Sequence, residues 1–213
     1  MFTYTSTAPE ATEAFGRALA HLLRPGDVLA LRGELGAGKT ALVRGIAAGL
    51  GVPPGAVSSP TFVVVNQYAA PGPISSLTHV DAYRVHSIEE LENLGWDRLF
   101  DAAGRALGNT VAVIEWPERL AGALTPDAAS IDLAHTGEEE RDITAAFPQA
   151  WRSRPDFDLL VGRRPALCPV TRKWVAQTAA TYPFADARAR DADLYKWIVP
   201  APDADDTADD TAE

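Results

Sequence analysis

The sequence contains little sulfur and no long hydrophobic run. Its 213 residues include one cysteine, Cys168, and one methionine. A single cysteine cannot form an internal disulfide, so a secreted disulfide-bonded scaffold is excluded and a reducing compartment is expected. No apolar run approaches 18 residues, and the first ten residues have neither a basic nor an apolar segment. We therefore expect no membrane span, no signal peptide and a cytoplasmic location.

Lysine is also scarce, because only Lys39, Lys173 and Lys196 occur in the chain. The net charge of −10 argues against a nucleic-acid-binding protein, whose surface is basic. The charge is uneven, however: residues 1–150 carry a net −8, residues 151–200 a net +4 and residues 201–213 a net −6. The exclusion of nucleic acid therefore applies to the first 150 residues and not to residues 151–200. A hydrophobic share of 46% excludes a disordered chain.

Helical and strand patterns alternate over the first 150 residues. Apolar spacing predicts helices over 9–23, 41–50 and 87–94, and strands over 2–5, 27–32, 62–68, 76–85 and 110–116. Thr7 and Glu10 have the spacing of a capping box, and Ser87 is a predicted helix cap. Residues 129–135 and 140–147 predict a late antiparallel pair. Together these patterns predict an α/β fold with a largely parallel central sheet, antiparallel edge strands and flanking helices.

The strongest motif is GELGAGKT at residues 33–40, which matches G-x-x-x-x-G-K-[ST] in full. It stands between a predicted buried strand and a predicted helix, where the glycines can turn backbone N–H groups toward phosphates. Lys39 would reach the β- and γ-phosphates, and the Thr40 hydroxyl would bind Mg²⁺. The motif predicts a P-loop NTPase-like domain. It does not by itself define the reaction.

Acidic residues on later strands are candidates for the rest of the site. Glu115 closes the strand at 110–116, the position of a carboxylate that completes Mg²⁺ coordination, although a surface acid is the alternative. Asp81 could bind metal or orient a water, or instead pair with Arg84. Residues 58–61 stand where a GTPase has a switch segment, but their composition also suits an ordinary turn. No N-K-x-D motif is present, which favours adenine over guanine.

The segments GELGAGKT, SSPTF, HVDAYR, LENLGW and IEWPERL together resemble the TsaE family, over about residues 3–147. This is the small bacterial ATPase of the tRNA threonylcarbamoyladenosine (t6A) pathway. The resemblance implies a P-loop-like α/β fold that binds ATP and Mg²⁺ and hydrolyses ATP slowly. It also implies support of the TsaB–TsaD pair, which modifies adenosine 37 of tRNA. The protein is then expected to contact tRNA only indirectly, through that complex, and no membrane is expected to be involved.

Site residues follow from the resemblance position by position. The implied catalytic residues are Lys39, Asp81 and Glu115, and the implied metal ligands are Thr40, Glu115 and Asp81. The implied nucleotide-binding residues are Thr12, Gly36, Ala37, Gly38, Lys39, Thr40, Ala41, Thr61, Trp116 and Arg141. Thr12 is expected near the adenine, Thr61 in the switch-like segment and Trp116 near the nucleotide.

The predicted domains are an ATPase domain over 1–147, an appended module over 148–200 and a disordered acidic tail over 201–213. The module is rich in aromatic and basic residues, with a predicted strand at 158–162 and predicted helices at 170–180 and 189–199. Such a surface could contact tRNA, or it could be an ordinary surface around a local core.

Two other functions fit a P-loop chain. A metabolite kinase would turn over ATP only with a small acceptor, and a nucleotide-gated binding module would bind ATP without hydrolysis. Arg44, Arg84 and Arg105 are candidates for an arginine that stabilises transferred phosphate, although each could equally be a solvated or ion-paired side chain. Without such an arginine, hydrolysis is expected to stay slow until a partner completes the site.

Overall fold

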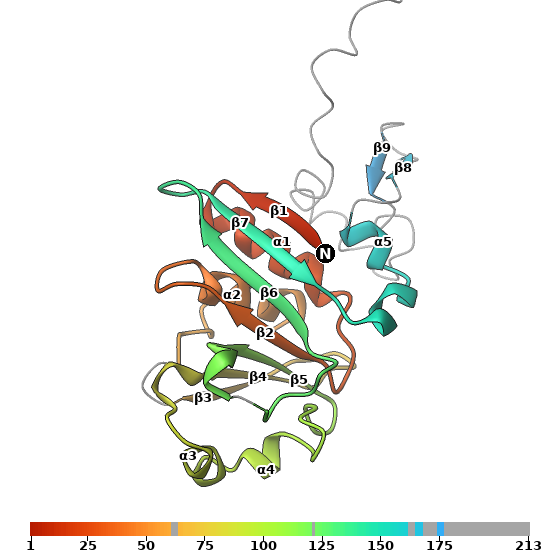
Figure 1. The fold of residues 1–213 in the computed structure, drawn as a ribbon. Coiled ribbons are helices and arrows are strands. Elements are labelled where there is room, and N and C mark those ends of the chain that lie inside the picture. The colour runs from red at the N-terminus through yellow and green to blue at the C-terminus, as the bar shows by residue number, and fades with distance from the viewer. Residues whose placement is uncertain (61–63, 121, 162–164, 168–173, 177–213) are drawn as a thin grey trace, which may run out of the picture. The chain divides into compact units, whose positions relative to one another are not determined.

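A mixed sheet of seven strands organises the protein (Figure 1). The computed structural model describes residues 1–60, 64–120, 122–161, 165–167 and 174–176. The strands are β1 (Phe2–Ser6), β2 (Val28–Arg32), β3 (Val65–Ala69), β4 (Ser76–Asp81), β5 (Thr110–Glu115), β6 (Ala129–His135) and β7 (Arg141–Ala146). Their order is β1-β7-β6-β2-β5-β4-β3. The central strands β6, β2, β5 and β4 are parallel, and β1, β7 and β3 join antiparallel. The predicted fold class is confirmed.

Helices flank this sheet on both faces. They are α1 (Pro9–Ala20), α2 (Lys39–Gly49), α3 (Ile88–Asn93) and α4 (Trp96–Leu99), with 3₁₀ turns η1 (Ala82–Arg84), η2 (Pro117–Leu120) and η3 (Gln149–Ser153). Helices α1 and α2 lie together on one face (Figure 1). They approach so closely that a Cβ on Gly45 would stand 2.0 Å from the Glu13 carbonyl oxygen, so this position requires glycine. None of the helices within the described residues is long and apolar enough to cross a membrane.

The two faces of the sheet carry different side chains because strand residues alternate between them. Val28, Val80 and Ile114 pack into a cluster with Leu91 of α3 and Phe100 after α4. The intervening residues of the same strands therefore point to the opposite face, where α1 and α2 lie. His79, Asp81 and Glu115 belong to this second set, so these three buried polar side chains point to the α2 face.

Three neighbouring parallel strands end at the same place. In the register of the sheet, Asp81 on β4 is opposite Glu115 on β5, and Glu115 is opposite Leu31 on β2. The chain then leaves β2 into the glycine-rich loop at residues 33–40. Ligands of open α/β sheets bind outside the carboxyl ends of the strands, so this edge is the expected site.

Two predicted strands have different bounds in the structure. The strand predicted over 62–68 begins only at Val65, because Val64 has a φ of 65° in the left-handed region, which breaks the extended backbone. The strand predicted over 76–85 ends at Asp81, whose carboxylate accepts a hydrogen bond from the Tyr83 N–H (3.0 Å) and caps η1. Residues 61–63 lie outside the described residues.

The predicted capping box at the first helix does not form. Helix α1 begins at Pro9 after Ala8, and no side chain in the described part of the chain caps it. Proline at the first helical position has no N–H to satisfy, which removes part of the need for a cap. The helix also ends at Ala20, short of the predicted residue 23. By contrast, Ser87 does cap α3 as predicted, accepting a hydrogen bond from the Glu90 N–H at 3.3 Å.

The chain divides into two units, Met1–Phe157 and Asp158–Glu213. Within the second unit, β8 (Pro165–Leu167) pairs antiparallel with β9 (Trp174–Ala176). The predicted strand at 158–162 is wrong, since Phe157–Leu160 forms helix α5, and the predicted helix at 170–180 is wrong at its centre, where β9 lies. Short apolar runs do not distinguish helix from strand by spacing alone. The predicted helix at 189–199 and the tail over 201–213 lie outside the described residues, so their structure stays a prediction.

The first unit continues ten residues beyond the expected boundary after Phe147, because the segment 148–157 is held to the core. Trp151 is buried and stacks on Phe147 with ring centroids 5.7 Å apart. The Arg154 guanidinium lies 3.9 Å from the Trp151 ring centroid and makes a two-pronged ion pair with Asp27, with N–O distances of 2.5 and 2.8 Å. This segment therefore belongs with the sheet.

Replacing Arg154 with leucine is expected to lower the free energy of unfolding of this unit by about 1–3 kcal/mol, because it leaves the largely buried Asp27 carboxylate without its counter-charge. Urea denaturation followed by circular dichroism measures the effect. Arg152→Leu is the matched control, since Arg152 is exposed and lies in the same turn. Equal stability of the two variants would contradict a structural role for this ion pair.

Candidate functional site

The glycine-rich loop joins β2 to α2 at the carboxyl edge of the sheet. Gly33 has a φ of 143°, and a Cβ there would stand 2.5 Å from the Leu133 carbonyl oxygen. Gly38 has a φ of 97° and precedes the first residue of α2. A Cβ on Gly38 would stand 3.2 Å from the Nε atom of Arg141, on β7. Both positions therefore require glycine, and the loop lies against β6 and β7.

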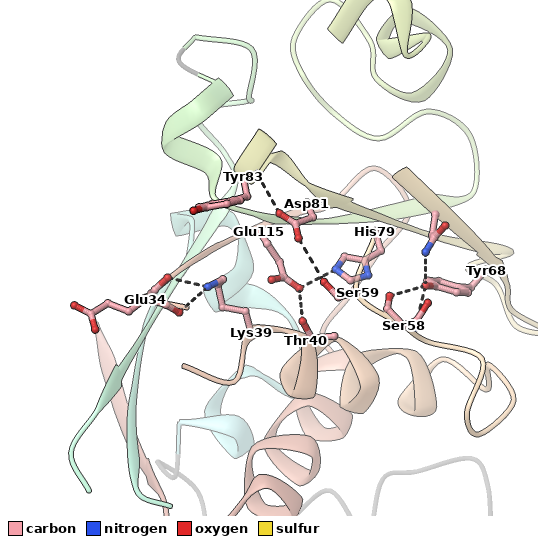
Figure 2. Close-up of polar contacts among 12 residues, drawn as sticks. Glu34, Lys39, Thr40, Ser58, Ser59, Tyr68, His79, Asp81, Tyr83 and Glu115 are labelled. Atoms are coloured by element: carbon pink, nitrogen blue, oxygen red, sulfur yellow. Dashed lines mark hydrogen bonds and ion pairs between the residues drawn. The ribbon is translucent and has the colours of Figure 1, made fainter. Parts of the chain in front are cut away.

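Lys39 is buried under this loop (Figure 2). Its Nζ donates hydrogen bonds to the carbonyl oxygens of Gly33 (2.8 Å) and Glu34 (2.9 Å), and it lies 4.1 Å from the centroid of the Trp116 ring. Burial lowers the pKa of the Lys39 ammonium, and the nearby carboxylates of Glu115, Asp81 and Glu118 oppose that shift. In this conformation the loop carbonyls and the indole together satisfy the ammonium group.

Glu115 lies at the centre of the polar contacts (Figure 2). Its Oε1 accepts a hydrogen bond from the Thr40 hydroxyl at 3.0 Å and lies 2.9 Å from the Nε2 atom of His79. Only 3% of Glu115 is exposed, so its carboxylate depends on these partners rather than on water. The alternative of a surface acid is therefore wrong. The sequence prediction that Thr40 and Glu115 share one site agrees with this 3.0 Å contact.

Asp81 lies beside this group on the neighbouring strand. One carboxylate oxygen accepts from the Tyr83 N–H, and the other accepts from the Ser59 hydroxyl at 3.4 Å. Ser59 is followed by Pro60 and Thr61, and Thr61 lies outside the described residues. The switch-like segment therefore reaches Asp81 through Ser59, while the predicted role of Thr61 stays a prediction.

Trp116 follows Glu115 in a left-handed backbone conformation, with a φ of 60°. This conformation is rare for a residue with a large side chain, and where it occurs it is concentrated at functional sites. The indole lies over the Lys39 ammonium on one side, and its ring centroid is 5.1 Å from that of Tyr83. Tyr83 is 43% exposed. The two rings therefore pack against each other beside the Lys39 ammonium group.

The other predicted nucleotide contacts have different surroundings. Gly36, Ala37 and Gly38 lie in the loop, and Ala41 lies in the first turn of α2. Thr12 is fully buried, and its hydroxyl is 2.8 Å from that of Ser6, which donates to the Ala8 carbonyl oxygen. Its predicted contact with adenine stays a prediction. Of the three candidate arginines, Arg105 forms an ion pair with Asp127 at 3.7 Å.

His79 and Tyr83 belong to the site although the sequence patterns above did not predict them. Both belong to the quoted segment HVDAYR, and His79 stands two residues before Asp81 on the same strand, hence on the same face of the sheet. That spacing was available as a signal for His79. Tyr83 had no comparable signal, since its position depends on η1, which replaces the end of the predicted strand.

The residues of the site fit a phosphate group with Mg²⁺. Arg141 has a buried Nε atom against Gly38 without a hydrogen-bond partner in the described part of the chain. The Thr40 hydroxyl and the Glu115 carboxylate place oxygen atoms of the type that Mg²⁺ prefers next to each other. No group of three or more His, Cys, Asp or Glu residues in the described ranges could hold a metal by itself. Mg²⁺ would therefore be held jointly with phosphate oxygens and water.

The sheet order, the loop and the lysine and threonine that follow it define a P-loop-type α/β protein, a fold that suggests nucleotide binding. The family model described as "Threonylcarbamoyl adenosine biosynthesis protein TsaE" matches residues 6–143. The chain belongs to the TsaE family.

Curated relatives agree with this assignment. The protein named "tRNA threonylcarbamoyladenosine biosynthesis protein TsaE" from Streptomyces coelicolor is 40% identical over 153 residues, which cover 69% of this chain and 97% of the relative. The protein of the same name from Bacillus subtilis is 38% identical over 136 residues, which cover 64% of this chain and 79% of the relative. The crystal structure of Bacillus subtilis YdiB has a TM-score of 0.51 at 29% identity, covering 70% of this chain and 88% of that chain.

Proposed function

We propose that this protein binds ATP with Mg²⁺, hydrolyses it slowly, and thereby supports a TsaB–TsaD pair in forming t6A on tRNA. The observation that carries the proposal is the grouping of Lys39, Thr40, Glu115 and Asp81 at the carboxyl edge of three neighbouring strands. The names of the relatives in Streptomyces coelicolor and Bacillus subtilis support the pathway. The ATPase reaction and the partners rest on the site chemistry and on the family resemblance.

Phosphate binding would use hydrogen-bond donors that already lie close together in the free site. The Lys39 ammonium now donates to two loop carbonyls, and phosphate oxygens would replace them as stronger, charged acceptors. Backbone N–H groups of the loop and the start of α2 would add further donors. The unpartnered Nε of Arg141 lies against the same loop and would meet the phosphates from the β7 side.

Hydrolysis would depend on the two carboxylates. Bound Mg²⁺ would neutralise charge on the β- and γ-phosphate oxygens. Glu115 and the Thr40 hydroxyl would hold it from the protein side, and Asp81 would orient the attacking water through its carboxylate. We propose that a partner completes the charge stabilisation and that the protein alone is therefore slow.

The test combines ATP binding, phosphate release and t6A formation with the purified full chain. Phosphate release is measured with and without TsaB and TsaD from the same organism, and t6A is measured with tRNA and a threonylcarbamoyl donor. We expect Mg²⁺-dependent ATP binding, slow release alone, and t6A formation that requires this protein. ATP binding without hydrolysis in the full mixture would instead support a nucleotide-gated binding module. Transfer of phosphate to a small acceptor would support a metabolite kinase.

A further inference from the structure

We propose that His79 is a positioning residue that sets the orientation of the Glu115 carboxylate. In this inference the His79 Nε2–H and the Thr40 hydroxyl both donate to Oε1 of Glu115, which leaves Oε2 for Mg²⁺ or a water bound to it. The inference rests on the proposed function, because it assigns a role at the same site.

The contact between His79 and Glu115 is short and buried. Nε2 lies 2.9 Å from Oε1, and the side chains are 0% and 4% exposed (Figure 2). Both groups are therefore buried from bulk water, and Oε1 takes its hydrogen bonds from protein donors. Among the described residues, the two hydrogen bonds that Glu115 accepts through its side chain come from His79 and Thr40, and both reach the same oxygen.

The tautomer of His79 follows from this contact. An ionised carboxylate oxygen accepts hydrogen bonds and cannot donate them, so we assign the proton of His79 to the Nε2 atom that faces it. An Nε2 that carries a proton and donates to Glu115 has no lone pair free for a metal. His79 therefore acts on the metal site through Glu115 and not as a ligand.

Among the residues that the structure describes, no second polar contact explains why an imidazole lies here. The other ring nitrogen, Nδ1, is buried and has no hydrogen-bond partner in the described ranges. On the same face, the residue two positions earlier on β4 is Leu77 and the residue opposite on β5 is Val113, both fully buried and apolar. A buried imidazole with one unpaired nitrogen is less favourable than an apolar side chain, and the bond to Glu115 is the feature that offsets this cost.

Partners of a metal-binding carboxylate typically change metal affinity by 10- to 100-fold when they are removed. His79→Leu removes the donor and keeps an apolar side chain of similar reach. His79→Gln keeps an N–H donor at about the position of Nε2. The two variants therefore separate the hydrogen bond from the packing of the ring. His86→Leu is the matched control, since the exposed His86 lies beyond η1, away from Glu115.

Titration calorimetry measures the affinity for ATP at increasing Mg²⁺ concentrations and in EDTA. The quantity compared between variants is the Mg²⁺ concentration at which the gain in ATP affinity is half of its maximum. We expect His79→Leu to raise this concentration by about 10- to 100-fold. His79→Gln should stay within about threefold of the parent, and ATP affinity in EDTA should stay within about twofold for both. A Leu variant with the parent's Mg²⁺ response would overturn the proposal, as would a Gln variant as impaired as the Leu variant. If the parent itself shows no Mg²⁺-dependent ATP binding, the proposed function fails instead.

A measurement on the parent protein covers the case in which His79→Leu does not fold. Nitrogen-15 spectra of the imidazole rings distinguish the two tautomers, and the His79 signal is assigned as the one that disappears in His79→Gln. We expect the Nε2–H tautomer, with a shift of this signal on addition of Mg²⁺ and ATP. The Nδ1–H tautomer would place no donor against Glu115 and would overturn the inference.

Discussion

Replacing Glu115 with glutamine is expected to lower the rate of ATP hydrolysis by about 10²- to 10³-fold, or roughly 2.7–4 kcal/mol in activation free energy. The amide keeps the shape of the side chain and an oxygen that can accept from Thr40 and His79, so the fold and these contacts should persist. What is lost is the negative charge that would hold Mg²⁺ next to Thr40. Phosphate release under saturating ATP and Mg²⁺ measures the effect.

Two comparisons make this result specific to the site. Glu92→Gln removes an exposed carboxylate on α3 and should leave the rate within about twofold. Circular dichroism and thermal denaturation should give the same fold for Glu115→Gln as for the parent. A folded Glu115→Gln protein with the parent's hydrolysis rate would remove Glu115 from the proposed mechanism, whatever the pathway in which the protein acts.

The approach of Asp81 and Glu115 could be predicted from sequence because it depends on strand ends. Each acid closes a hydrophobic segment, and parallel neighbours bring their carboxyl ends to one edge of the sheet. The P-loop was equally predictable, because its glycines, lysine and threonine have a fixed spacing between a strand and a helix. These features are local, or follow from sheet topology alone. They account for most of the candidate site.

The remaining features of the fold and of the site depend on contacts between distant segments, which no local sequence pattern encodes. Val64 and Trp116 both adopt left-handed backbones, a conformation that their residue types disfavour, so the surrounding structure imposes it. The proximity of Arg141 to Gly38 arises because β7 comes late in the chain yet pairs beside β6, under the loop. His79 was missed for a different reason, since its spacing from Asp81 was visible but its bond to Glu115 joins two strands.

Replacing Lys39 with methionine is expected to weaken ATP binding by at least about 100-fold. Two charge-assisted hydrogen bonds from the ammonium group, worth about 1.5–3 kcal/mol each, would be lost in the bound state. Methionine has a similar length and flexibility, so the side chain can still fill the space under the loop. Titration calorimetry with ATP and Mg²⁺ measures the affinity.

The same substitution should not lower the stability of the free protein. Burial lowers the pKa of Lys39 in the folded state, so near neutral pH folding carries the cost of burying its charge. That cost is fully present below the folded pKa and declines as the pH rises toward the ordinary value of 10.5, because the unfolded chain then binds more protons. Methionine carries no charge at any pH. The melting temperature of free Lys39→Met should therefore equal or exceed that of the parent. The increase in melting temperature that ATP causes in the parent should be absent in Lys39→Met.

Lys173→Met is the matched control, since it removes another of the chain's three lysines at a position outside the described residues. It should bind ATP with the affinity of the parent, because every residue of the candidate site belongs to the first unit. Tight ATP binding by Lys39→Met would exclude the loop as the phosphate site. A loss of affinity together with a lower melting temperature would show that Lys39 stabilises the free loop through Gly33 and Glu34 more than its buried charge costs.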